Sequence, residues 1–270
     1  MAETLRRVLN LGTSARSGEE DTAEAGPPLL LLGGPGSGKT ALLFAAALEA
    51  AGEGRGPVLF LTRRPLQSLP RGTGAALDPL RLQKVRLRTL WAGFPWKDCL
   101  RYLKIRFQYP PSTHELLQLL CSAHEARGPA PSLLLLDGLE EYLVEDQGPQ
   151  DAAYLAALLL DTAAHFSHQT GPGQGCGLIV ALQTQEEGVS GDALQVSLLQ
   201  RYFPAQCWLQ AETPGPGQHR LRACLDPGGL GPRAEWCVAF RPNGEMTITP
   251  WPTQAGNLSL DKGSSSGGQP

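Results

Sequence analysis

The sequence predicts an α/β fold in which a mostly parallel, twisted sheet carries helices on both faces and antiparallel strands at its C-terminal edge. Three observations support this prediction. Short apolar runs alternate with longer helical patterns, as in sheets whose parallel strands are joined by crossover helices. Four leucines lead into a glycine-rich turn and then into an Ala- and Leu-rich segment. In the C-terminal quarter, short strand-like runs are separated by Pro and Gly clusters, which is typical of antiparallel strands.

The elements can be assigned from apolar runs and their flanking residues. Short apolar or alternating runs predict strands at residues 29–32, 58–62, 104–109, 133–137 and 178–182. Helical patterns predict helices at residues 40–51, 112–124 and 151–168. Gly52 stops the first helix, and Ser112 or Thr113 caps the second, with Glu115 placed for a capping box if Ser112 is the cap. Four more strands, expected to complete one edge of the sheet as antiparallel neighbours, lie near residues 207–210, 221–225, 235–240 and 245–249.

Length and composition favour a single folded domain with two tails. The chain has 270 residues, 41% of them apolar and 18% charged, as in ordinary globular proteins. We expect residues 1–26 and 253–270 to be disordered, because both are polar and lack sustained periodicity. The net charge of −3 provides no general attraction to nucleic acid or membrane, so any such binding needs a local patch.

The sequence also predicts a cytosolic or nuclear protein with no membrane partner. No apolar run approaches the roughly twenty residues that span a bilayer. The N-terminal segment is polar and acidic, unlike a secretory or transit peptide. The six cysteines are widely spaced without a CxxC pair, so we expect reduced thiols rather than a zinc site or a disulfide framework.

One motif indicates a nucleotide-binding site. The segment matches G-x-x-x-x-G-K-[ST] between a predicted strand and a predicted helix, and it comprises Gly33, Gly34, Pro35, Gly36, Ser37, Gly38, Lys39 and Thr40. The glycines let backbone N–H groups converge on phosphate oxygens at a helix N-terminus. Lys39 is expected to reach the β- and γ-phosphates of ATP, and the Thr40 hydroxyl to ligate Mg²⁺. The alternative is a glycine-rich turn without a ligand.

Candidate acids and an amide follow the later strands. Asp137 ends a run of four leucines, as expected of the acid that holds Mg²⁺; it would otherwise cap the turn at Gly138. Glu140 and Glu141 follow closely and are either activators of the attacking water or a solvated pair. Gln185 is either a sensor of the γ-phosphate or a polar strand end exposed to solvent.

The order of these features resembles the RecA-like recombinases and their eukaryotic paralogues. More closely, the chain is similar to the ATPases that associate with a SWIM-type zinc finger protein in the vertebrate Shu-like complex, through residues 27–33, 58–66, 105–110, 133–141 and 200–206. The resemblance implies that residues 27–252 form a RecA-like ATPase domain. It also implies a nuclear, DNA-binding hetero-oligomer that partners the SWIM-type protein, a RecA-like recombinase and its paralogues, and promotes homologous recombination repair.

The sequence departs from the recombinase pattern at one position that matters for chemistry. Those enzymes carry a catalytic Glu just after the second strand, where this chain has Thr62, Arg63, Arg64 and Pro65. The resemblance therefore implies slow hydrolysis, or hydrolysis that depends on Glu140 or Glu141. From the sequence we also expect no counterpart of the N-terminal helical DNA-binding domain of the recombinases.

A basic segment is the candidate for binding single-stranded DNA. Residues 81–106 hold eight basic residues and four aromatic ones against a single acid, Asp98. The basic residues are Arg81, Lys84, Arg86, Arg88, Lys97, Arg101, Lys104 and Arg106. Cations that follow phosphates and rings that stack on bases suit a single strand. By comparison with similar proteins, residues 85–104 are instead an insertion, and a solvated charged face is the simpler interpretation.

Three functions remain open from the sequence. The first is a recombination-mediator subunit that binds single-stranded DNA and hydrolyses ATP slowly, with turnover stimulated by DNA. The second is a non-catalytic assembly partner of the SWIM-type protein, in which ATP acts as a structural ligand. The third is a small-molecule kinase, because the same phosphate-binding loop occurs in that class.

Overall fold

The computed structural model describes residues 5–8, 26–52, 56–66, 104–125, 128–143, 149–170, 175–184, 190–212, 219–229, 231–241 and 246–252. Gln185, nearly all of the proposed insertion at 85–104 and the C-terminal segment 253–270 lie outside these ranges. Among the described residues, no helix has the length and apolar character needed to cross a membrane.

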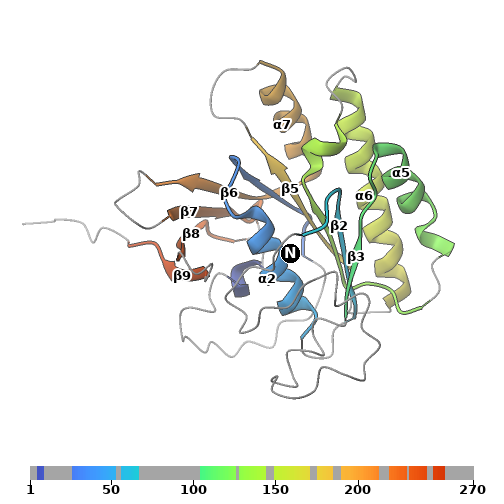
Figure 1. The fold of residues 1–270 in the computed structure, drawn as a ribbon, viewed down its shortest axis with the longest axis horizontal. Coiled ribbons are helices and arrows are strands. Elements are labelled where there is room, and N and C mark those ends of the chain that lie inside the picture. Colours follow the sequence, from blue (N-terminus) through green and yellow to red (C-terminus); the bar gives the residue numbers. More distant parts are fainter. Residues whose placement is uncertain are drawn as a thin grey trace, which may run out of the picture.

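Nine strands form one sheet in the order β3-β2-β4-β5-β1-β6-β7-β8-β9 (Figure 1). Their bounds are β1 Leu29–Gly33, β2 Val58–Thr62, β3 Ile105–Gln108, β4 Leu133–Asp137, β5 Gly177–Gln183, β6 Ala205–Ala211, β7 His219–Asp226, β8 Ala234–Phe240 and β9 Met246–Pro250. The strands from β3 to β6 pair in parallel, and β7, β8 and β9 are added antiparallel. This arrangement confirms the predicted mixed sheet.

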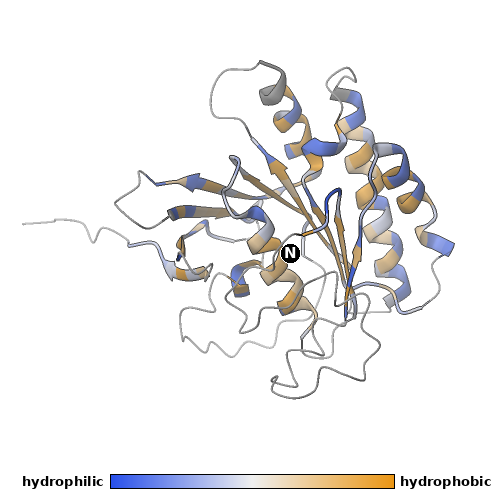
Figure 2. Cartoon of the chain, in the orientation of Figure 1, coloured by the Kyte–Doolittle hydropathy of each residue, from blue (hydrophilic) through white to orange (hydrophobic). Residues whose placement is uncertain are grey.

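Helices cover both faces of the parallel part (Figure 1). On one face lies α2 (Lys39–Ala50), and on the other lie α5 (Thr113–Cys121), α6 (Pro149–Thr170) and α7 (Ser190–Tyr202). Two short 3₁₀ helices, η1 (Ala123–Glu125) and η2 (Leu139–Tyr142), flank β4. Leu29 and Leu31 point into the α2 side, whereas Leu30 and Leu32 point into the other. Burial on both faces explains why β1 is an unbroken run of leucines. The strands in the middle of the sheet are largely orange, the colour of hydrophobic residues, in Figure 2.

The structure corrects three expectations from the sequence. The strand β6 pairs in parallel with β1, so the antiparallel part begins only at β7. The helix α7 was not expected, and the second predicted helix ends at Cys121 rather than at residue 124. Within the segment expected to be disordered, residues 5–8 are helical, and Leu5 and Val8 are buried in the core on the α2 side. Burial of these two apolar side chains offsets the conformational entropy that the segment loses when it becomes ordered. The polar composition of the segment gave no sign of this burial.

The topology places the phosphate-binding loop and the acid that ends β4 at the same edge of the sheet. The carboxyl ends of β1 and β4 flank that of β5, since β5 lies between them. Ligands of open α/β sheets bind beyond the carboxyl ends of parallel strands, at the points where helices begin. The phosphate-binding loop and Asp137 therefore lie at the same edge, although 97 positions separate Thr40 from Asp137.

The start of α5 provides a test of local stability. The Ser112 hydroxyl accepts a hydrogen bond from the Glu115 backbone N–H at 3.2 Å, so Ser112 rather than Thr113 is the cap. Ser112→Ala should lower the free energy of unfolding by about 1 kcal/mol, because it leaves that N–H without a protein partner. Ser122→Ala, at the exposed C-terminal end of the same helix, is the matched control and should change it by less than about 0.5 kcal/mol. Urea unfolding measures both; equal effects would contradict the cap assignment.

Candidate functional site

The loop between β1 and α2 folds around the side chain of Lys39. Gly36 and Gly38 have φ angles of 70° and 72°, in the left-handed region that glycine tolerates. The Lys39 ammonium donates hydrogen bonds to the carbonyl oxygens of Gly33 at 2.8 Å and Gly34 at 2.7 Å, and to the Ser37 hydroxyl at 3.2 Å. The loop therefore encloses a cation at the N-terminus of a twelve-residue helix, which is where anions bind.

Burial sets the electrostatics of this cation. Removal of Lys39 from water lowers its pKa, and the nearby carboxylates of Glu140 and Asp137 partly oppose that effect. A desolvated ammonium gains more from an added negative charge than an exposed one does, because the local dielectric is low. Phosphate oxygens would therefore be stronger partners for Lys39 than the carbonyl oxygens that it now contacts.

Thr40 and Asp137 meet beside Lys39. The Thr40 hydroxyl donates a hydrogen bond of 2.7 Å to a carboxylate oxygen of Asp137. Burial raises the pKa of Asp137, and the Thr40 hydrogen bond acts in the opposite direction. A hydroxyl oxygen next to a carboxylate is the hard oxygen pair that Mg²⁺ selects. This contact favours the metal-holding interpretation of Asp137 over a role as a cap of the following turn.

The loop has the shape that ATP requires. A Cβ added at Gly36 would meet nothing within 4 Å, and one added at Gly34 would first meet the Thr184 carbonyl at 3.9 Å. The crest of the loop is therefore open. At Gly33, by contrast, a Cβ would lie only 2.6 Å from the Ser37 hydroxyl oxygen. The open crest, the enclosed cation and the Thr40–Asp137 pair together fit a phosphate chain with Mg²⁺.

Phe240 supports the loop from the C-terminal part of the sheet. A Cβ at Gly38 would lie 2.4 Å from Cζ of Phe240, so the ring tip lies directly against the glycine. Only a residue without a side chain fits between the ring and the start of α2. Sequence reasoning missed this contact, because nothing in the motif indicates which residue of β8 reaches the loop.

The structure gives Glu140 and Glu141 different contacts, whereas the sequence did not distinguish their roles. Glu140 accepts a hydrogen bond of 2.8 Å from the Gln183 backbone N–H, at the end of β5. Since Gln183 pairs with Gly33 in the sheet register, this contact holds Glu140 on the side of the phosphate-binding loop. Glu141 instead approaches Arg64, with 3.6 Å between its carboxylate and Nε. Glu140 is therefore the better placed of the two to act on a bound phosphate.

An arginine occupies the position after β2 where the recombinases keep their catalytic Glu. Thr62 pairs with Asp137 across β2 and β4, which places Arg63 next to the site. Its guanidinium donates to the backbone carbonyls of Pro111 at 2.9 Å and Glu141 at 2.6 Å. Arg63 thus holds η2 against the start of α5, and it has no capacity to accept a proton.

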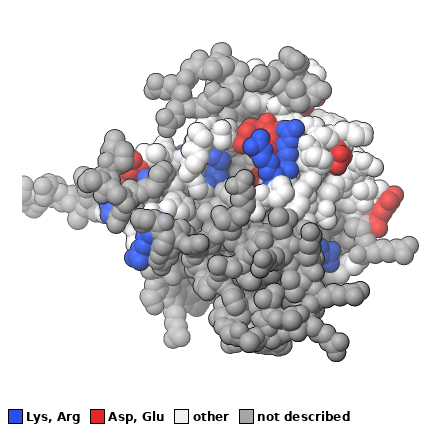
Figure 3. Space-filling view, viewed as in Figure 1, with Lys and Arg blue, Asp and Glu red and all other residues white. Residues whose placement is uncertain are grey.

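Two further hydrogen bonds hold η2 in place. The buried Tyr142 hydroxyl donates to the Pro110 carbonyl at 3.0 Å, and the Thr113 hydroxyl donates to the Tyr142 carbonyl at 2.7 Å. Burial of Tyr142, with the nearby Glu141 charge, raises its pKa well above the usual range, so the hydroxyl stays a donor. Figure 3 shows positive and negative side chains adjoining one another on the face seen in Figure 1. The helix η2 is a fixed platform that carries Glu140.

Comparison with known proteins identifies close relatives. No protein-family model matches the chain. The chain is 74% identical to the human (Homo sapiens) protein named ATPase SWSAP1 over 246 residues, which cover 91% of this chain and 99% of that protein. It is 61% identical over 269 residues to the mouse (Mus musculus) protein of the same name, covering 99% of this chain and 88% of that protein.

Solved structures share the fold at low sequence identity. The RadB recombinase superposes with a TM-score of 0.50 at 16% identity, covering 78% of this chain and 88% of the other. A DnaB-like replicative helicase has a TM-score of 0.52 at 12% identity, covering 92% of this chain and 66% of the other. These similarities confirm the predicted RecA-like fold.

Asp137→Asn tests the electrostatics of the Thr40–Asp137 pair. Because burial raises the pKa of Asp137, its ionised form opposes folding at neutral pH, and this cost disappears as pH falls through the raised pKa. The variant removes the charge and keeps an oxygen for Thr40. We expect an unchanged or higher Tm for the nucleotide-free chain at pH 7, with at least about tenfold weaker ATP binding in the presence of Mg²⁺.

The control for this test is Asp226→Asn, which alters an exposed ion pair with Arg233 far from the loop. It should change neither Tm nor ATP affinity appreciably. Differential scanning fluorimetry and ATP titration with and without Mg²⁺ supply the readouts. A marked fall in Tm for Asp137→Asn alone would show that its carboxylate is a structural group.

Proposed function

Because the chain belongs to the family of the ATPase SWSAP1, we propose that it binds Mg²⁺–ATP at Gly33–Thr40 and Asp137 and hydrolyses it slowly. The observation that carries this proposal is the 2.7 Å hydrogen bond between Thr40 and Asp137. It joins the phosphate-binding loop to the acid of a strand that is not its neighbour, and it brings together two oxygen groups that suit a bound Mg²⁺.

The roles of the residues follow from their positions. Lys39 binds the β- and γ-phosphates, backbone N–H groups of the loop orient them, and Thr40 and Asp137 hold Mg²⁺. Bound Mg²⁺ neutralises charge that develops on the phosphate oxygens. Glu140 takes the proton of the attacking water, and Arg63, through Glu141, keeps η2 and Glu140 in place. Hydrolysis is slow because the general base approaches from η2 instead of from the end of β2.

We further propose that the chain is the DNA-binding subunit of a nuclear recombination-mediator complex. The support is its resemblance to ATPases that associate with a SWIM-type zinc finger protein, together with its family membership. In this proposal it partners that protein, a RecA-like recombinase and its paralogues, and favours recombinase action on single-stranded DNA. DNA binding stimulates the slow ATP turnover.

A second candidate is a non-catalytic assembly subunit of the same complex. One observation favours it: Arg63, which cannot act as a base, stands at the position of the usual catalytic acid. Lys39→Ala would then abolish ATP binding and leave complex formation unchanged. Nothing in the described part of the chain favours a small-molecule kinase.

Glu140→Gln and Glu141→Gln together test which acid serves hydrolysis. The two substitutions are identical in chemistry and adjacent in sequence, so each is the control for the other. Glu140→Gln should lower the ATP turnover number at least about tenfold with little change in ATP affinity, because a general base supplies a factor of about 10²–10⁴ in typical enzymes. Glu141→Gln should retain most of the activity.

The measurement is phosphate release at saturating ATP, with Lys39→Ala as the baseline for contaminating activity. Loss in Glu141→Gln alone would transfer the role to that residue. Equal turnover in the wild type and in Lys39→Ala would support the non-catalytic candidate instead.

The DNA-binding proposal makes a prediction about salt. Fluorescence anisotropy with labelled oligo(dT) should show an association constant that falls linearly with salt on logarithmic axes, with a slope of about −0.7 per phosphate contacted. Saturating oligo(dT) should also raise the ATP turnover rate. No binding of the full chain at low salt would refute the DNA-binding part and leave the ATP site untouched.

A further inference from the structure

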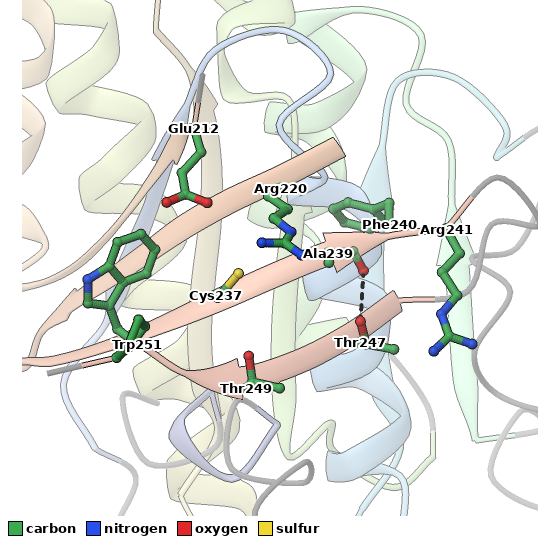
Figure 4. A pocket seen from close by; sticks show the side chains of 10 residues that line it. Glu212, Arg220, Cys237, Ala239, Phe240, Arg241, Thr247, Thr249 and Trp251 are labelled. Carbon is green, nitrogen blue, oxygen red and sulfur yellow. Dashed lines mark hydrogen bonds between the residues drawn. The ribbon is translucent and has the colours of Figure 1, made fainter. Parts of the chain in front are cut away.

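A groove lies on the face of the antiparallel strands opposite α2. It has a volume of about 420 Å³, and Figure 4 shows the side chains that line it, most of them on β7, β8 and β9. Its lining is Glu212, Arg220, Cys237, Ala239, Phe240, Arg241, Thr247, Thr249, Trp251 and Pro252. None of these residues belongs to the phosphate-binding motif or to the acids discussed above.

Strand alternation determines the chemistry of this face. In β7, Leu221 and Ala223 enter the core on the α2 side, so Arg220 and Arg222 point the other way. In β8, Trp236 and Val238 enter the same core, so Cys237 and Ala239 line the groove. The face left outside the core is therefore rich in arginine and hydroxyl groups instead of apolar side chains.

The charges of the groove favour an anionic occupant. Its lining contains Arg220 and Arg241 against a single acid, Glu212. Arg222, next to the groove, donates to Glu235 from Nε at 3.0 Å, so that acid is already neutralised. The local excess of positive charge stands out in a chain whose net charge is −3. Such an excess attracts phosphates, and the attraction weakens as salt is added.

An aromatic ring is fixed at the other end of the groove. The guanidinium of Arg222 lies 4.7 Å from the ring centroid of Trp251. The backbone N–H of Trp251 donates to the Glu235 carbonyl at 3.0 Å, which extends the pairing between β9 and β8. Trp251 is half-buried, and Arg222 covers one face of its ring, so a base would stack on the other face. An acidic peptide would use the arginines but would have no need of the ring.

We propose that single-stranded nucleic acid lies across β7, β8 and β9, with its phosphates at Arg220 and Arg241 and a base against Trp251. This inference rests on the proposed DNA binding and assigns its location. Thr247 and Thr249 supply hydroxyl groups to the sugar-phosphate backbone between these points. The groove lies on residues well separated in sequence from the basic segment 81–106.

The location also links DNA to the ATP site. Phe240 borders the groove, but its ring packs on the α2 side of the sheet, with its tip against Gly38 of the phosphate-binding loop. Arg241 follows it directly in the chain, and Arg220 lies opposite Ala239 in the strand register. A strand of nucleic acid on these arginines would lie on the opposite face of β8 from the Phe240 ring, one residue along the chain from the residue that supports the loop. Phe240 is a positioning residue through which the groove and the loop affect each other.

The test compares charge-removing variants in the full chain. Arg220→Gln/Arg241→Gln should weaken oligo(dT) binding at least tenfold at moderate salt, and its salt slope should be shallower by about 1.4, since two phosphate contacts are lost. Affinity for ATP should stay within twofold. Arg233→Gln is the matched control: Arg233 is also exposed and directly precedes β8, but it pairs with Asp226 outside the groove. It should leave oligo(dT) binding unchanged.

Each other outcome has a distinct meaning. Wild-type binding with unchanged binding by the double variant would refute the groove and leave the proposed DNA binding intact. No wild-type binding at low salt would refute both. A loss of ATP affinity in the double variant would assign the groove to the nucleotide. Tighter wild-type binding to a polyglutamate peptide than to oligo(dT) would assign the groove to an acidic protein partner.

Photocrosslinking gives a localisation that does not depend on variant folding. Oligo(dT) that carries 5-iodouracil, irradiated with the wild-type chain, should crosslink to the peptide that contains Trp251. Crosslinks confined to other peptides would contradict the proposal. Saturating oligo(dT) should change the ATP affinity of the wild-type chain at least twofold, and Phe240→Leu should abolish that difference. Retention of that difference would refute the link through Phe240.

Discussion

A buried ammonium group organises the carboxyl edge of this sheet. The Lys39 side chain lies inside its own loop, held by the carbonyls of Gly33 and Gly34. Its burial depends on the leucine strand beneath it and on the glycines that let the loop close. Because this charge is kept out of water, a negatively charged ligand such as a phosphate would stabilise it more than it would stabilise an exposed lysine. Asp137, whose pKa is raised by the same desolvation, lies close enough to be part of the same electrostatic system.

Around this centre, the residues after β2 and β4 differ from the pattern expected of the recombinases. Arg63 fills the place of the expected base and binds two backbone carbonyls instead of a water molecule. The acid that faces the loop comes from η2, where Glu140 is tied to the end of β5. Hydrogen bonds from Tyr142 and Thr113 hold η2 against the start of α5. This geometry is the basis of the proposal that the chain binds ATP well and hydrolyses it slowly.

The parts of the site that follow from local pattern were predictable from the sequence. Gly33 to Thr40 and Asp137 could be assigned because a strand, a loop and a helix must follow one another in fixed spacing. The direction taken by Glu140 and Glu141 could not, since it depends on the end of β5 and on Arg64. The same holds for the contact of Phe240 with Gly38, which joins segments about 200 positions apart.

In the fold, too, some features were predictable from local sequence patterns and others depend on tertiary contacts. Apolar runs predicted every strand, but the parallel direction of β6 depends on its pairing with β1 rather than on its own residues. Leu5 and Val8 lie in a polar segment and are buried only because the core on the α2 side leaves room for them. Tertiary contacts of this kind leave no periodic signal in a sequence.

The most direct test of the central claim is a structure of the chain with Mg²⁺ and a non-hydrolysable ATP analogue. The measurement is the distance from each nearby carboxylate to the γ-phosphate. The account predicts that Lys39 leaves the Gly33 and Gly34 carbonyls for the phosphates, that Thr40 and Asp137 flank Mg²⁺, and that Glu140 is the nearest free acid. A nucleotide bound elsewhere, or Glu141 nearer than Glu140 with Arg63 displaced, would contradict it.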